Sequence, residues 1–136
     1  MNPAKFTIFL VDDDFDYLYQ LKAKIEKFGY RTVTAESQKE AEELLEKLKP
    51  DLAILDLMME KEDSGFILCY KMKKKYPDVP IIIVSGVMTE TGISFDINDE
   101  SNRKWIKADR FLDKGIRAER LKEEIDKLLE KKTGNA

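Results

Sequence analysis

The stretch KFTIFLVDDD, residues 5–14, constrains the fold of this 136-residue chain more than any other part of its sequence. Its apolar run, Phe6–Val11, has the length and composition of a strand buried on both faces. The run stops at three consecutive aspartates. Ligands bind at the carboxyl ends of strands in open α/β sheets, and adjacent like charges are unfavourable unless a cation or a proton compensates them. The sequence therefore predicts a positive group near Asp12, Asp13 and Asp14.

Short apolar runs of this kind recur along the chain and alternate with helical patterns. The predicted strands are 6–11, 30–35, 52–55, 81–84 and 110–112. Apolar residues spaced three and four apart predict helices between them. The predicted helices lie over 18–28, from the capping-box residue Ser37 to before Pro50, over about 66–76, and over 121–129. Asp14 or a neighbour can cap the first of these helices, and Gly29 fits its end.

Strands that alternate with helices predict an α/β fold, with one parallel sheet and helices on both of its faces. Five strands suit the doubly wound order 2-1-3-4-5, in which the first and third strands are neighbours. This order brings Asp12 and Asp13 close to Asp56, with Ser85 and Lys114 at the ends of the next two strands. We expect a single domain over 1–136, with a core at about 5–130 and a polar tail at 131–136.

The residue content limits the chemistry. The chain has no histidine and one cysteine, Cys69, which excludes histidine general bases and zinc sites built from thiolates. A lone cysteine cannot form an internal disulfide, so a reducing cytoplasm is expected. The net charge of −3 gives no nucleic-acid footprint, and we expect no membrane span and no signal peptide. Carboxylates, hydroxyls and amines must therefore supply any chemistry.

Four motifs occur in order, each at the end of a predicted strand: VDDD at 11–14, LDLMM at 55–59, VSG at 84–86 and FLDKG at 111–115. Each is weak alone, but together they resemble the signature of response-regulator receiver domains of two-component signalling. The resemblance extends from Phe6 to about Leu129. It implies a flavodoxin-like, receiver-type fold and a phosphoacceptor function that switches a partner-binding surface.

The resemblance also implies a role for each matched residue. Asp56 would accept a phosphoryl group from a histidine kinase, a phosphotransfer protein or a small phosphodonor. Mg²⁺ or Mn²⁺ would support this transfer, because such ions take oxygen ligands and bridge to phosphate. The metal ligands would be Asp12 through water, Asp13, Asp56 and the Met58 carbonyl; Ser85 and Lys114 would bind the phosphoryl group; Ser85 and Phe111 would form the switch.

We expect a stand-alone receiver that catalyses at most its own phosphorylation and dephosphorylation. No DNA-binding domain is expected in this chain, and the output partner is not identified. Two alternatives stay open. The spacing Asp12-x-Asp14, with a later serine and lysine, also resembles haloacid-dehalogenase-type phosphatases, which are Mg²⁺-dependent phosphohydrolases. The same fold could also serve only for binding, as a pseudo-receiver.

Three departures from the family pattern stand out. Gly115 follows Lys114 where receivers usually have a proline after a cis bond, and we expect a trans bond here. Glu60 replaces a usual proline, and the glycine that follows comes one residue late, at Gly65, so the loop 57–65 is longer and more charged. The segment between Ser85 and Lys114 is also longer than usual, which predicts an altered or partly mobile fourth helix within 87–107.

Overall fold

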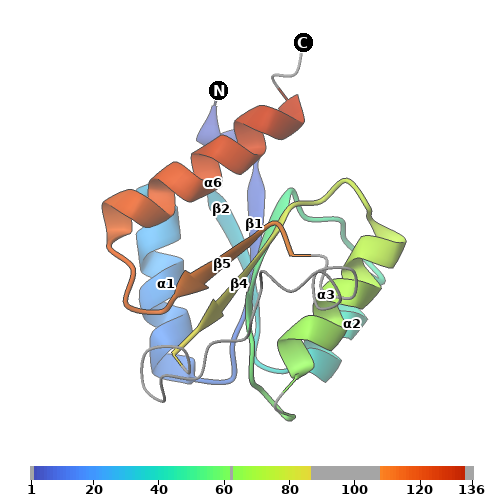
Figure 1. Ribbon diagram of the computed structural model, residues 1–136. Helices are drawn as coiled ribbons and strands as arrows, with labels where there is room; N and C mark the ends of the chain where they lie inside the picture. Colours follow the sequence, from blue (N-terminus) through green and yellow to red (C-terminus); the bar gives the residue numbers. More distant parts are fainter. Residues whose placement is uncertain (1, 62, 87–107, 134–136) are drawn as a thin grey trace.

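The computed structural model describes residues 2–61, 63–86 and 108–133. Within them, five parallel strands form one sheet in the order β2-β1-β3-β4-β5, as predicted (Figure 1). The strands are β1 (Thr7–Val11), β2 (Arg31–Ala35), β3 (Leu52–Asp56), β4 (Ile81–Ser85) and β5 (Arg110–Asp113). The helices are a short 3₁₀ turn, η1 (Pro3–Lys5), and α1 (Phe15–Lys27), α2 (Gln38–Leu45), α3 (Ser64–Lys75) and α6 (Ala118–Thr133).

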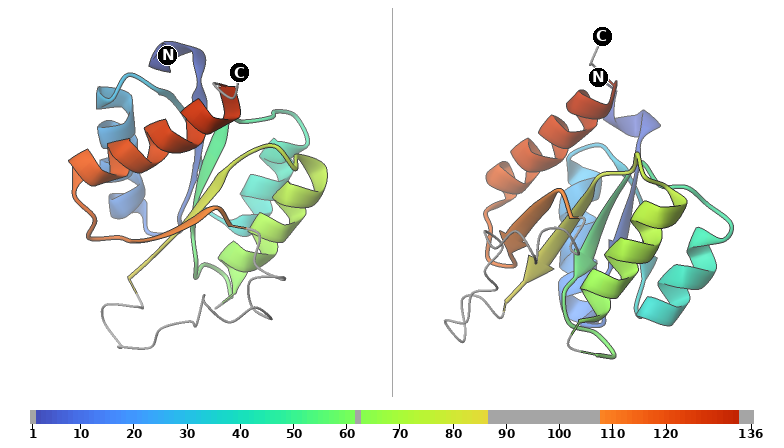
Figure 2. Two further views of the ribbon diagram at one scale, coloured as in Figure 1. Left: turned by 45° about the horizontal axis from the view of Figure 1, so that its top comes forward. Right: turned by 45° about the vertical axis from the view of Figure 1, so that its right-hand side comes forward.

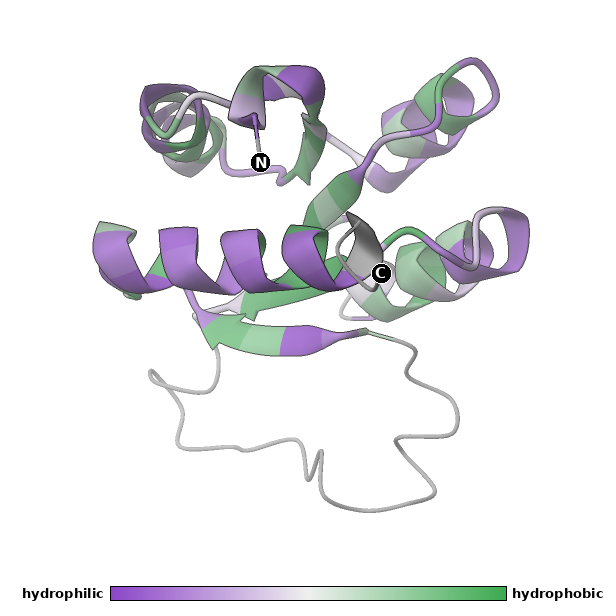
Figure 3. Cartoon of the chain, turned by 90° about the horizontal axis from the view of Figure 1, so that it is seen from above, coloured by the Kyte–Doolittle hydropathy of each residue, from purple (hydrophilic) through white to green (hydrophobic). Residues whose placement is uncertain are grey.

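Helices cover both faces of the sheet. Helices α1 and α6 lie on one face, and α2 and α3 lie on the other (Figures 1 and 2). Successive residues of β1 point to opposite faces, so Phe9 packs with α2 and α3, whereas Leu10 packs with α1 and α6. Strands β3 and β4 are buried along their whole length. The strands are therefore hydrophobic, while α6, which leads to the C-terminus, is mainly hydrophilic on its outer side (Figure 3).

Capping residues predicted from the sequence fix the helix ends. The Asp14 side chain accepts a hydrogen bond from the Tyr17 amide and caps α1. The Ser37 side chain accepts a hydrogen bond from the Glu40 amide and caps α2. After α1, Gly29 has a φ of +104°, a left-handed conformation that L side chains rarely adopt. The start of α2 at the Ser37 cap was predicted correctly, whereas α1, α3 and α6 begin two or three residues before the predicted ranges.

Some element boundaries differ from the predicted ranges. Helix α2 ends at Leu45, well before Pro50. Helix α6 reaches Thr133, inside the stretch 131–136 that we expected to be a polar tail. Strands β3, β4 and β5 each include the polar residue that follows the apolar run, because the parallel ladder still pairs Asp56 with Val84 and Ser85 with Asp113. The sheet itself therefore carries the candidate site residues.

The altered fourth helix predicted within 87–107 lies outside the described residues. None of the helices in the described ranges combines the length and the apolar composition that crossing a lipid bilayer requires.

Candidate functional site

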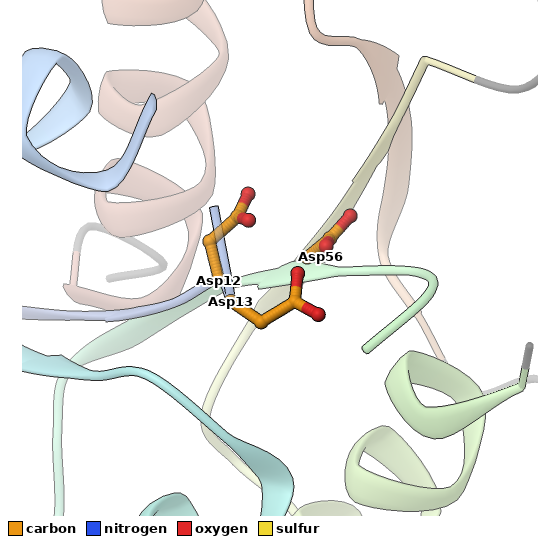
Figure 4. Close-up of side chains that lie close together, drawn as sticks. All are labelled: Asp12, Asp13 and Asp56. Carbon is orange, nitrogen blue, oxygen red and sulfur yellow. The ribbon is translucent and has the colours of Figure 1, made fainter. Parts of the chain in front are cut away.

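Three carboxylates converge at the carboxyl end of the sheet. Asp12 and Asp13 follow β1 directly, and Asp56 is the last residue of β3. Strands β1 and β3 are neighbours, and Val11 pairs with Leu55, so the two strands end at the same level. One oxygen from each of the three carboxylates lies within 4.8 Å of the others. Figure 4 shows the three side chains close together. The predicted convergence of Asp12, Asp13 and Asp56 is therefore present.

Lys114, from the loop after β5, is the positive group that the sequence predicts beside these aspartates. Its Nζ lies 3.0 Å from Asp12 Oδ2 and 3.2 Å from Asp56 Oδ1. Asp12 is 1% exposed and Asp56 is 5% exposed, whereas Asp13 is exposed. One ammonium therefore faces two buried carboxylates, which leaves the cluster with an excess of negative charge.

Burial and charge shift the protonation of these groups. Burial, together with the negative charge of Asp12 and Asp13, raises the pKa of Asp56 to about 7, although Lys114 opposes the change. Burial alone would lower the pKa of Lys114, but its contacts with Asp12 and Asp56 outweigh burial and raise it. Lys114 therefore stays charged. Near neutral pH, the Asp56 carboxyl group is only partly ionised unless another cation binds beside it.

The hydrogen bonds of Asp12 leave one oxygen available to a cation. Asp12 Oδ1 accepts a hydrogen bond of 2.8 Å from the Asp14 amide. Asp12 Oδ2 is buried, and no described residue gives it a hydrogen bond of acceptable geometry, even though the Lys114 ammonium is at ion-pair distance. A buried oxygen without a hydrogen bond is costly. A cluster of three carboxylates with such an oxygen fits a hard divalent cation.

Two hydrogen bonds donated by backbone amides fix the loop that carries Lys114. The Lys114 amide donates to the Ser85 carbonyl at 3.2 Å, and the Gly115 amide donates to Asp113 Oδ1 at 2.6 Å. The Lys114–Gly115 bond is trans, as we predicted, since the described residues contain no cis peptide. A proline at position 115 would lack the N–H group that makes the second bond.

Ser85 and Phe111, the predicted switch residues, occupy neighbouring strands. Ser85 is buried at the end of β4, next to Val84, the residue paired with Asp56. Phe111 is partly buried in β5, and its ring centroid lies 6.0 Å from that of Phe66 at the start of α3. Both residues therefore belong to the part of the sheet beside Asp56, while Phe111 packs away from the carboxylates against α3.

The loop after β3 packs tightly against its surroundings. The Gly65 amide donates to the Leu57 carbonyl at 2.7 Å, and a Cβ on Gly65 would lie 2.4 Å from the Asp56 carbonyl oxygen. The Glu60 carboxylate accepts hydrogen bonds from the Gln38 and Lys39 amides, which tie this loop to the start of α2. The loop that follows Asp56 is therefore fixed by α3 and α2. The Met58 side chain is exposed, and Glu62 lies outside the described residues.

Reasoning from the sequence missed two residues at this site. The Tyr17 ring lies under the Lys114 ammonium, with 4.7 Å between Nζ and the ring centroid. Burial raises the Tyr17 pKa to about 12, against the effect of Lys114, so the hydroxyl stays protonated. Tyr17 follows the cap Asp14 by three residues, but no local pattern reveals which side chain its ring meets. The Glu60 contact with α2 was missed for the same reason.

Comparison with known proteins gives consistent matches. The family model of the response regulator receiver domain matches residues 8–126. The probable transcriptional regulator ycf27 of Cyanophora paradoxa is 33% identical over 87 residues, which are 64% of this chain and 36% of the relative. Its namesake from Porphyridium aerugineum is 28% identical over 125 residues, which are 92% of this chain and 48% of the relative. The chain thus spans less than half the length of these relatives.

Solved structures match over nearly the whole chain. A CheY-like receiver domain from Methanospirillum hungatei superposes with a TM-score of 0.82 at 24% identity, covering 96% of this chain and 98% of that one. The response regulator TrrA of Thermotoga maritima, solved in complex with Mg²⁺-BeF, superposes with a TM-score of 0.74 at 28% identity. That match covers 90% of this chain and 98% of TrrA.

Proposed function

Because the chain belongs to the response-regulator receiver domain family, we propose that it accepts a phosphoryl group on Asp56 as a component of a two-component system. The observation that supports this most strongly is the convergence of Asp12, Asp13, Asp56 and Lys114, from three separate segments, at one end of the sheet. Phosphoryl transfer depends mainly on positioning and on neutralising charge, and this site has groups for both.

Asp56 is the proposed nucleophile. One of its carboxylate oxygens attacks the phosphorus atom of the donor, so that a new P–O bond forms as the bond to the donor's leaving group breaks. The leaving group is an imidazole nitrogen when the donor is a phosphohistidine, and acetate when the donor is acetyl phosphate. The attacking oxygen must be deprotonated. A cation bound beside Asp56 favours the carboxylate form, and so makes the nucleophile available at neutral pH.

Lys114 and Ser85 are proposed to receive the transferred group. The Lys114 ammonium pairs with phosphoryl oxygens in place of its present contact with Asp56, and the Ser85 hydroxyl donates a hydrogen bond to another phosphoryl oxygen. Movement of Ser85 toward the phosphoryl group leaves space into which Phe111 turns. This change would alter a surface recognised by an output partner. The donor is proposed to be a histidine kinase or a phosphotransfer protein, and the working compartment the cytoplasm.

Asp12, Asp13 and Asp56 are the residues proposed to hold Mg²⁺, or Mn²⁺, with the Met58 carbonyl as a further ligand and Asp12 acting through water. The buried Asp12 Oδ2, which lacks a good hydrogen bond, and the oxygen-only donor set support this assignment. TrrA was solved in complex with Mg²⁺-BeF. When bound, such an ion neutralises charge on the phosphoryl group and the attacking carboxylate.

The phosphohydrolase alternative, which rests on Asp12-x-Asp14, receives no support from the site. Asp14 is exposed, and its side chain caps α1 by accepting a hydrogen bond from the Tyr17 amide. Asp56, for which that alternative offers no role, lies in the carboxylate cluster instead. Under the receiver assignment, Asp14 caps α1 and Asp56 accepts the phosphoryl group.

Intact-mass spectrometry after incubation with acetyl phosphate and Mg²⁺ tests the proposal. We expect a gain of one phosphoryl group that the Asp56→Asn variant does not show. Labelling that persists in Asp56→Asn but disappears in Asp12→Asn would favour the phosphohydrolase. A wild-type protein that is folded and binds Mg²⁺ yet gains no mass from either acetyl phosphate or phosphoramidate would support the pseudo-receiver.

A further inference from the structure

The surroundings of the Lys114 ammonium include one neutral contact. Asp12 and Asp56 lie 3.0 and 3.2 Å from Nζ, and the face of the Tyr17 ring lies 4.7 Å away on another side. A cation over the face of a tyrosine is attracted by the ring's quadrupole. The ring is therefore a third attractive contact for Lys114, of a kind different from the two carboxylates.

The first turn of α1, which carries Tyr17, is tied to Asp12 of the acidic cluster through Asp14. The Asp14 amide donates to Asp12 Oδ1 at 2.8 Å, and the Asp14 carboxylate accepts from the Tyr17 amide at 3.2 Å. These two bonds fix the first turn of α1 against the end of β1. The ring is partly buried and packs against the hydrophobic cluster between the sheet, α1 and α6. Tyr17 is therefore positioned before any ligand binds.

The carboxylate contacts and the ring contact respond differently to a divalent cation. A cation held by Asp13 and Asp56, and by Asp12 through water, competes with the ammonium for the carboxylates that Lys114 now contacts, and like charges repel. A neutral aromatic face is a poor ligand for a hard cation, which prefers oxygen. Of the contacts found around Nζ in the described part of the chain, the ring is the one that Lys114 can keep when the carboxylates turn to the metal.

We propose that Tyr17 is a positioning residue for Lys114, which keeps the ammonium at the phosphoryl-binding end of the sheet while Asp12, Asp13 and Asp56 hold the divalent cation. This inference rests on the proposed phosphoacceptor function. Tyr17 touches neither the phosphorus atom nor the nucleophile, and it acts through Lys114. The free energy typical of a cation–π contact corresponds to a change of about 2- to 30-fold in the rate of phosphoryl labelling.

The rate of labelling by acetyl phosphate at saturating Mg²⁺ gives the first test, on the full chain. Tyr17→Leu removes the aromatic face, and we expect the labelling rate to fall about fivefold or more. Tyr17→Phe keeps the aromatic face, and we expect this variant to be labelled at the wild-type rate. Tyr19→Leu is the matched control, because Tyr19 is exposed on the same helix and makes an edge-to-face contact with Phe15. We expect the rate of this control to equal that of the wild type.

A ring series separates the attraction from simple packing. Phenylalanine at position 17, and then phenylalanines with one, two and three ring fluorines, keep the size of the side chain while weakening its electrostatic face. We expect the logarithm of the labelling rate to fall steadily with fluorination, and the Lys114 ¹⁵Nζ resonance to shift in parallel, at unchanged melting temperature. If the wild type is labelled and every member of the series is labelled at the same rate, the proposed role of Tyr17 is overturned. If the wild type is not labelled at all, the proposed function is overturned instead. In that case the Lys114 ¹⁵Nζ resonance still tests the contact with Tyr17: a shift that follows fluorination supports the contact, and a resonance that does not change overturns it.

Discussion

At the residue scale, Asp56 holds the most perturbed protonation equilibrium of the site. Its carboxyl group is 5% exposed, lies beside Asp12, and shares the Lys114 ammonium with that residue. A pKa of about 7, against an ordinary value of 3.8, means that the folded state holds a proton that the unfolded state releases. In the absence of metal, the residue proposed to carry the chemistry therefore lowers the stability of the fold at neutral and alkaline pH.

This raised pKa gives a prediction for stability. Between about pH 4 and pH 7 the folded protein binds more protons at Asp56 than the unfolded chain does, so the free energy of unfolding falls as the pH rises through this window. Asp56→Asn removes this dependence. In EDTA at pH 8, we expect the variant to be about 2 kcal/mol more stable than the wild type. At pH 4 the difference should nearly vanish.

Urea unfolding at the two pH values measures this effect. Equal pH dependence in the wild type and in Asp56→Asn would contradict the assignment of a raised pKa to Asp56.

At the scale of elements, the contact between α3 and the end of β3 fixes the loop that follows Asp56. Gly65 lies in the first turn of α3, and its Cα faces the backbone of Asp56 and Leu57. This close approach explains why the chain has a glycine there without any need for a left-handed conformation. It also explains how a longer, charged loop at 57–63 still leads into a helix that packs against the sheet.

Gly65→Ala tests this contact. The added Cβ would lie 2.4 Å from the Asp56 carbonyl oxygen and 2.7 Å from Leu57 Cα, so α3 must move away from the strand end. We expect a loss of about 2 kcal/mol in the free energy of unfolding and weaker Mg²⁺ binding, as measured by urea unfolding and by calorimetry. Gly115→Ala is the control, since among the described residues its Cβ would meet only the Asp113 carboxylate, at 3.1 Å. Equal stability of the two variants would argue against the proposed role of Gly65.

Local patterns predicted the elements where a single segment determines its own structure. The apolar run 6–11, the Asp14 and Ser37 caps and Gly29 each carry their signal within a few residues, and each was confirmed. The ends of α2 and α6 depend on packing against other elements, so the sequence placed the end of α2 only before Pro50, and α6 extends beyond the predicted range 121–129. The Glu60 bonds to the start of α2 join residues about twenty positions apart, which no local pattern encodes.

At the scale of the whole molecule, the strand order brings the site together. The sequence predicts which residues end each strand, and the order 2-1-3-4-5 then determines that β1 and β3 are adjacent. The convergence of Asp12, Asp13 and Asp56 follows from that order. The position of the Tyr17 ring against Lys114 does not, because it depends on side-chain packing between the first helix and a loop from the far end of the chain.

Metal binding should stabilise the whole fold, because the ligands come from both β1 and β3. A ligand that binds only the folded state, present at ten times its Kd, raises the free energy of unfolding by about 1.4 kcal/mol. We expect Mg²⁺ to do this for the wild type, and to do so much less for Asp13→Asn. Asp13 is exposed and Asp12 is buried, so removing the charge of Asp13 should leave the metal-free protein nearly as stable as the wild type.

Thermal unfolding with and without Mg²⁺ measures this coupling. K⁺ at matched ionic strength is the control for simple screening of the acidic cluster. Stabilisation of equal size in the wild type and in Asp13→Asn would place the cation elsewhere.

The most direct test of the central claim is to locate the phosphoryl group itself. An aspartyl phosphate is reduced by borohydride to homoserine, which marks the modified residue permanently for peptide mass spectrometry. After incubation with acetyl phosphate and Mg²⁺, we predict homoserine at position 56 and at no other aspartate, with the yield greatly reduced in Lys114→Met. Homoserine at position 12 or 13, with Asp56 unmodified, would contradict this assignment.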